Sequence, residues 1–234
     1  MNNNITKIAI CTALLGSTAA PLSIASASES AWSTSANISL ATEQAFRGRS
    51  QTNEKAALYG SLDVGHSSGF YAGVWGSNRA YAGGLELDLY AGFAKSGFNI
   101  GYVQYIYPND EEFTSNNNGV GADFGELYIK YSFKGFTIGA AFSPDWFAET
   151  GDAQNYSIDW SRNILPKTNL ALHLGINRFD DEARALPNHE DYSISITQKL
   201  TNNFSAFGSI VGTNLDRGND SEDDRFIVGV KAAF

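Results

Sequence analysis

The chain has 234 residues, and 25 acidic residues against 16 lysines and arginines give it a formal net charge of −9. Such an acidic chain is poorly suited to bind nucleic acid. Its single cysteine, Cys11, lies in the N-terminal apolar run, which excludes disulfides and cysteine-based metal sites or nucleophiles from the rest of the chain. No later segment approaches the roughly 20 apolar residues that a membrane-spanning helix needs.

Residues 1–27 have the pattern of a secretory signal. Lys7 precedes an apolar run from Ile8 through Ile24, which ends at the small-x-small motif Ala25-Ser26-Ala27. Glycine, serine, threonine and proline interrupt the run and no stop-transfer flank follows, so we favour a cleaved signal over a transmembrane anchor. Without Lys7 the 16 basic residues become 15, and the formal charge becomes −10. Residues 28–234 are then long enough for one all-β domain.

Period-two alternation runs through residues 28–234 and predicts strands with one apolar face and one polar face. It is clearest from Leu85 to Phe93, where leucines alternate with carboxylates, and together with Gly69–Asn78 this stretch predicts an antiparallel hairpin. Within the eleventh predicted strand, Phe207 and Val211 break the alternation, so its orientation stays open. We expect twelve strands, with 10 or 14 as alternatives, in this order: Trp32–Leu40, Ala56–Val64, Phe70–Asn78, Leu85–Phe93, Phe98–Tyr107, Gly125–Phe133, Phe136–Ser143, Tyr156–Ser161, Leu170–Asn177, Tyr192–Thr197, Phe204–Thr213 and Arg225–Phe234.

The connections between these strands alternate strictly between short and long. This rhythm is typical of bacterial outer-membrane barrels, which have short periplasmic turns and long external loops. An even strand count returns both termini to the same, periplasmic, side. The short connections are 66–69, 95–97, 134–135, 163–167 and 201–203, and the longer ones are 42–55, 108–123, 144–153, 178–191 and 214–224, with a shorter member after Asn78.

Aromatic residues gather at the strand ends next to the short turns, as in the interfacial girdle of a membrane barrel. A soluble sandwich would instead place its aromatics inside, in the middle of the strands. The polar face is dominated by small residues, as a narrow lumen requires. We therefore predict a single antiparallel transmembrane β-barrel with its apolar face toward lipid, in preference to a soluble lipocalin-like barrel.

Four segments resemble the TorF family of proposed porins, also known as the Gcw_chp family of proteobacterial proteins. They are FRGRSQ (46–51), GFYAGVWGSN (69–78), LELDLYAGF (85–93) and YIYP (105–108). Gln44 and Arg49 depart from the usual pattern of the first loop. The resemblance implies an outer-membrane barrel and a pore, without a defined substrate. The C-terminal Phe234 is similar to the terminal aromatic residue that outer-membrane proteins present to the assembly machinery.

The predicted lumen face carries more carboxylates than cations, which favours a weakly acidic channel for small cationic or neutral solutes. The alternative is that these charges pair across the lumen and close it, since twelve strands lie between the filled eight-strand barrels and the water-filled sixteen-strand barrels. The lumen-facing candidates are Asp63, Glu86, Asp88, Glu126, Asp159 and His173, with Lys130, Arg225 and Lys231 as counter-charges.

Two arginines, Arg47 and Arg49, fall in the first external loop. They either contact lipid phosphates or fold inward and narrow the pore against Glu86 and Asp88. Acidic groups in the other external loops either bind Ca²⁺ or remain solvated, bridged to lipopolysaccharide by divalent ions. We expect membrane lipid, lipopolysaccharide and the assembly machinery as partners, and no cofactor.

Two other functions stay open. One is a structural or adhesive barrel without an open pore. The other is an outer-membrane hydrolase with its base at His189, which lies near the external rim beside Glu190 and Asp191. Neighbouring residues on a strand face opposite ways, so this run does not by itself form a dyad. We expect a channel and no enzyme.

Overall fold

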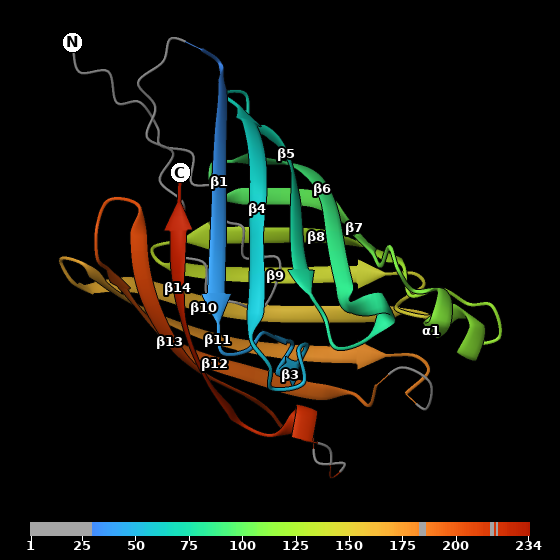
Figure 1. Cartoon of the computed structure of the whole chain (residues 1–234). Helices are drawn as coiled ribbons and strands as arrows, with labels where there is room; N and C mark the ends of the chain where they lie inside the picture. Colours follow the sequence, from blue (N-terminus) through green and yellow to red (C-terminus); the bar gives the residue numbers. More distant parts are fainter. Residues whose placement is uncertain (1–29, 183–185, 216–217, 219) are drawn as a thin grey trace.

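The computed structural model describes residues 30–182, 186–215, 218 and 220–234. The predicted signal, residues 1–27, lies outside them and stays a prediction. Twelve strands form a closed barrel in which each strand is antiparallel to both neighbours (Figure 1). Within the described part of the chain, no helix is long and apolar enough to cross a membrane. The predicted fold class, an all-β barrel of twelve antiparallel strands, is therefore confirmed.

Short turns join the barrel strands at one end and longer loops join them at the other. The loops carry the small elements β2 (Ala45–Phe46), β3 (Arg49–Ser50), η1 (Ala82–Gly84), α1 (Glu111–Asn116) and η2 (Asp220–Glu222). The barrel strands are β1 (Trp32–Ala41), β4 (Ala57–His66), β5 (Phe70–Asn78), β6 (Leu85–Lys95), β7 (Phe98–Ile106), β8 (Phe124–Phe133), β9 (Phe136–Ser143), β10 (Ala153–Leu165), β11 (Thr168–Phe179), β12 (His189–Lys199), β13 (Phe204–Thr213) and β14 (Arg225–Ala233).

One predicted connection is wrong. Residues 163–165 belong to β10 rather than to a turn, because the strand continues through an irregularity between Asn163 and Leu165 and stays paired with β11. The open question on β13 is also answered. Phe207 and Val211 pair across to Gly229 and Arg225 and both face the interior, so the strand keeps its alternation and places two apolar side chains inside.

The barrel closes where β1 pairs with β14, from Asn37 opposite Ala233 to Ala41 opposite Gly229. Beyond this ladder, the backbones of Ala36 and Phe234 exchange two hydrogen bonds of 2.9 and 3.0 Å. The side chain of Phe234 is 69% exposed on the outer face of this seam. Its predicted role in assembly stays a prediction, but its position at the closing strand suits that role.

The outer face of the barrel is apolar along all its strands. Leu62 on β4 is 62% exposed, and Leu89, Ile138 and Ile194 are exposed in the same way. A soluble monomer rarely exposes so large an apolar surface, whereas hydrocarbon needs such a band. Aromatic rings meet at the short-turn end, where Phe70 and Phe93 lie 5.1 Å apart between ring centroids. The predicted lipid-facing side is thus outward.

The inner face departs from the prediction that small residues dominate it. On β4 to β8 it is filled by large buried aromatic side chains, and glycines on the neighbouring strands make room for them. Gly92 stands directly opposite Tyr71, and a Cβ at Gly92 would lie 2.6 Å from the carbonyl oxygen of Ile100 and against the Tyr71 ring. Gly73 opposite Tyr90 and Gly101 opposite Tyr128 repeat the arrangement. The buried aromatics on this side are Tyr59, Tyr71, Trp75, Tyr90, Tyr105, Phe124 and Tyr128.

Candidate functional site: an inward-folded loop in the lumen

The first long loop, residues 42–56, folds into the barrel instead of extending into solvent. Its short hairpin pairs Ala45 with Ser50 and Phe46 with Arg49. In Figure 1, β3 lies at the long-loop end, beside the ends of β1 and β4. The turn residues Arg47 and Gly48 have φ values of 49° and 80°, a backbone conformation that glycine adopts without strain.

The tip of this hairpin reaches the far wall of the barrel. Arg47 Nη2 lies 2.6 Å from Glu126 Oε1 on β8, and its carbonyl oxygen is 3.2 Å from His189 Nε2 on β12. A Cβ at Gly48 would lie 2.7 Å from the carbonyl oxygen of Gly212 and 2.9 Å from the Cβ of Asp191. The hairpin therefore spans the lumen from β1 to β8 and β12.

The base of the loop is held by a second set of polar contacts. Arg225 Nη1 donates to Glu43 Oε1 over 3.0 Å, and both side chains are buried. Gln44 accepts hydrogen bonds from Ser77, at 2.8 Å, and from Arg79. Arg79 in turn binds Glu86 through two of its nitrogens, with Nε 2.8 Å from Glu86 Oε2. Buried polar contacts of this kind hold a loop more firmly than exposed ion pairs do.

Glu86 keeps the guanidinium of Arg79 in its charged form. Burial tends to lower the pKa of the guanidinium, but the carboxylate of Glu86 outweighs this effect and raises the pKa above its ordinary value. Burial also raises the pKa of the nearby Tyr81 to about 12, so its phenol stays neutral and donates to the side-chain oxygen of Gln51 in the loop. On this side, the loop therefore contacts a neutral phenol, Tyr81, and a charge that is paired, Arg79 with Glu86.

The inward alternative for Arg47 and Arg49 is the one that the structure adopts, but with different partners. Arg47 pairs with Glu126, while Arg49 Nη2 lies 3.2 Å from Ser221 Oγ and its Nε lies 3.6 Å from Glu222. Their partners are therefore not Glu86 and Asp88, which the inward alternative had named. Arg79, which the sequence analysis did not single out, pairs with Glu86 instead.

The candidate carboxylates on β4 to β8 are buried inside the barrel wall and its aromatic packing. Asp63 accepts hydrogen bonds from Tyr90 and, at 2.7 Å, from Ser61. Glu126 uses its second oxygen to accept from Tyr105 at 2.9 Å. Asp88 differs, because among the described residues neither of its carboxyl oxygens has a hydrogen-bond partner, although the residue has no exposed surface.

On the opposite wall, β9 to β11, several inward side chains stay partly accessible. His173 Nδ1 lies 2.7 Å from Asp159, and its Nε2 lies 2.9 Å from Asp191. The His173 ring is therefore held between two carboxyl groups. The side chains of Asp159 and His173 are 36% and 24% exposed. Lys130 on β8 and Lys231 on β14 are also half-buried. The described lumen is therefore asymmetric, packed along β4 to β8 and more open along β9 to β11.

His189 does not have the surroundings of a catalytic base. It is fully buried, and its ring nitrogens lie 2.9 Å from the carbonyl oxygen of Pro187 and 3.2 Å from that of Arg47. Neither nitrogen is hydrogen-bonded to a carboxylate or open to water. Across the described residues, no group of three or more His, Cys, Asp or Glu side chains is arranged to hold a metal ion. The geometry argues against the hydrolase hypothesis.

The profile of the family described as a bacterial protein of unknown function, Gcw_chp, matches residues 25–234. The chain belongs to the Gcw_chp family. The comparison with curated proteins gives no match.

Solved porins share the fold of this Gcw_chp protein. The NanC porin superposes with a TM-score of 0.54 at 10% sequence identity, over 84% of this chain and 98% of that one. The KdgM porin gives a TM-score of 0.54 at 11% identity, over 86% of this chain and 99% of that one. At such identities the likeness concerns the fold, which is that of outer-membrane porin barrels.

Proposed function

We propose that this Gcw_chp protein is an outer-membrane porin with a narrow, weakly acidic lumen for the passive passage of small cationic or neutral solutes. The observation that carries the proposal is the inward hairpin, whose tip is fixed to β8 and β12 by Arg47 and Gly48. The hairpin narrows the lumen and leaves the inward side chains of Asp159 and His173 partly accessible beside it. The apolar outer face and the porin-type fold support the location in the outer membrane.

Burial decides which inner side chains can contact a solute. Glu86 and Asp88 are buried behind the packed wall, so we do not expect them to touch a passing solute. Asp159 and His173 lie on the accessible wall and Lys130 lies on the neighbouring strand β8, so we expect these side chains to border the path, with Lys231 farther around the barrel on β14. Charged rings of this kind select ions by sign.

The test is conductance of the refolded full-length barrel in a planar lipid bilayer. We expect stepwise openings, and any preference for cations depends on Asp159, the half-exposed carboxylate of the accessible wall. The preference should fall in Asp159→Asn, which removes a half-exposed carboxylate, and should change less in Asp88→Asn, which removes a buried one. Absence of any conductance would contradict the proposal and leave a structural or adhesive barrel. Equal effects of both variants would contradict the assigned path.

A further inference from the structure

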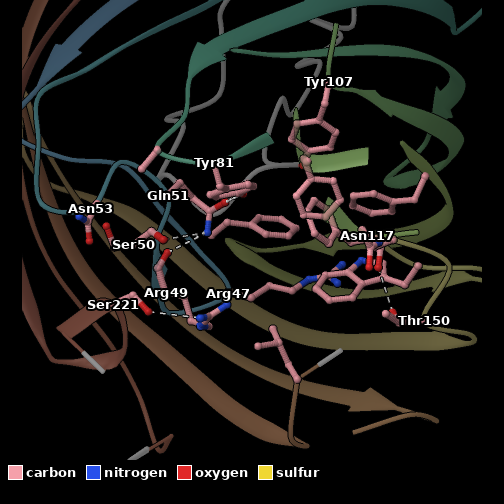
Figure 2. A pocket seen from close by; sticks show the side chains of 18 residues that line it. Arg47, Arg49, Ser50, Gln51, Asn53, Tyr81, Tyr107, Asn117, Thr150 and Ser221 are labelled. Carbon is pink, nitrogen blue, oxygen red and sulfur yellow. Dashed lines mark hydrogen bonds between the residues drawn. The ribbon is translucent and has the colours of Figure 1, made fainter. Parts of the chain in front are cut away.

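A cavity of about 710 Å³ lies at the long-loop end of the barrel, bordered on one side by the β2–β3 hairpin. Figure 2 shows Arg47 and Arg49 reaching it from the hairpin, and Tyr81 and Tyr107 facing it from other loops. Its volume is within the range of small-molecule sites. Because it lies where the external loops converge on the hairpin, a solute that enters the lumen from this end meets it first.

Aromatic side chains make up a large part of the walls of this cavity. The ring of Phe147 is central, with centroids 5.8 Å from Tyr81, 5.6 Å from Tyr107 and 5.4 Å from Phe113. Trp146 lies on the same loop and packs 4.6 Å from Phe179. Aromatic faces present flat apolar surfaces at low entropic cost. They suit a ring-shaped solute that has C–H groups on its faces and polar groups around its edge.

Two hydrogen-bond donors in this wall have no acceptor within the described protein. They are Nη1 of Arg47 and Nε1 of Trp146, and the Arg47 guanidinium lies 6.0 Å from the centroid of the Trp146 ring. Both side chains are about nine-tenths buried, at 10% and 8% exposure. Buried donors without acceptors are unfavourable, so oxygen atoms of a bound solute would compensate them after a small side-chain movement.

The charges around the cavity favour a neutral ligand. Among the described residues that line it, Arg47 and Arg49 are the only charged ones. Each already has a carboxylate neighbour outside the lining, Glu126 at 2.6 Å and Glu222 at 3.6 Å. A bound anion would therefore bring an uncompensated charge into a buried site, and a cation would meet two arginines.

We propose that this aromatic cavity binds a neutral pyranose sugar and serves as the solute-recognition site at the channel mouth. The inference rests on the proposed porin function for its biological meaning, although binding itself is measurable without transport. The ring faces of the sugar lie against the aromatic wall, and its hydroxyl oxygens accept from Arg47 and Trp146.

The test is calorimetric titration of the refolded full-length barrel in detergent with four probes. D-glucose should bind saturably. Sorbitol, which keeps the hydroxyl groups but has no ring face, should bind at least several-fold more weakly. D-glucuronate and D-glucosamine should bind no more tightly than glucose. Absence of saturable glucose binding, equal binding of sorbitol, or tighter binding of either charged sugar would overturn the proposal.

A matched pair of variants locates the site. Trp146→Phe keeps an aromatic ring but removes the indole donor, so the affinity for glucose should fall about three- to tenfold. Trp160→Phe makes the same change on β10, away from the cavity lining, and should leave the affinity unchanged. Equal losses in both variants would overturn the assignment. If Trp146→Phe does not fold, the comparison of glucose with sorbitol on the unmodified chain still tests the proposal.

Conductance of the same preparation separates this proposal from the porin proposal. Openings without glucose binding would refute only the sugar site. Glucose binding without openings would refute only the channel and would leave a barrel that binds sugar at its outer end. Partial block of the openings by glucose, reduced in Trp146→Phe, would support both.

Discussion

Replacing Gly48 with alanine should release the hairpin from the barrel wall and raise the conductance of the pore. Gly48 has a φ of 80°, a region that costs an L-residue about 1–2 kcal/mol. The added Cβ would also lie 2.7–2.9 Å from three atoms of β12 and β13. Overpacking of this kind costs about 1–3 kcal/mol, which shifts the ratio of released to docked hairpin by about 5- to 150-fold.

Gly119→Ala is the matched control for this variant. Gly119 lies in another external loop with a φ of 87°, and nothing comes within 4 Å of a Cβ added there. Gly119→Ala has the same backbone cost as Gly48→Ala, but its added Cβ meets no neighbouring atom. In planar bilayers we expect larger unit conductance for Gly48→Ala alone, with limited proteolysis reporting the exposed hairpin. Equal conductance changes in both variants, or none in Gly48→Ala, would refute the view that contact with the wall holds the loop inside.

Three further changes test the packing, the loop anchor and the closing strand. Gly92→Val would push the Tyr71 ring off the wall and should lower the unfolding free energy by about 1–3 kcal/mol, measured by urea titration of the barrel in detergent. Glu126→Gln would leave Arg47 buried without its carboxylate, a loss of about 3–5 kcal/mol for the docked loop, and should raise unit conductance. Phe234→Ala should slow assembly, seen as a smaller heat-modifiable fraction on gels, because it removes the exposed aromatic ring of the seam.

Each of these changes has a control on the same barrel. A Cβ at Gly208 would make only ordinary contacts, the nearest at 3.7 Å, so Gly208→Val should perturb unfolding less than Gly92→Val. Glu190 forms an exposed ion pair with Arg178 at 3.5 Å, and Glu190→Gln should cost no more than about 1 kcal/mol. Phe204→Ala removes an exposed aromatic ring that is not C-terminal. If a control variant has as large an effect as the test variant it is matched to, the reasoning for that test variant is contradicted.

The sequence by itself determined the barrel, because the patterns that predict a barrel lie within short segments of the chain. Alternation from Leu85 to Phe93 specifies which side chains leave the sheet on each face, since the strand period is two. The short turns and long loops then order the strands, and the observed pairing follows the chain from β4 through β14 before β1 closes the ring. The same local pattern placed Asp63, Glu126 and His173 on the inner face, where the structure also has them.

Only the tertiary structure decided which inner side chains meet. Arg47 and Glu126 are 79 positions apart, and no local pattern relates them. The inward fold of residues 42–56 depends on glycine-sized space at Gly48 and on acceptors supplied by β8 and β12. The asymmetry of the lumen likewise arises because the tyrosines of β4 to β8 lie over glycines of neighbouring strands. Alternation assigns a side chain to a face, but the partner and the remaining space are set by closure of the whole barrel.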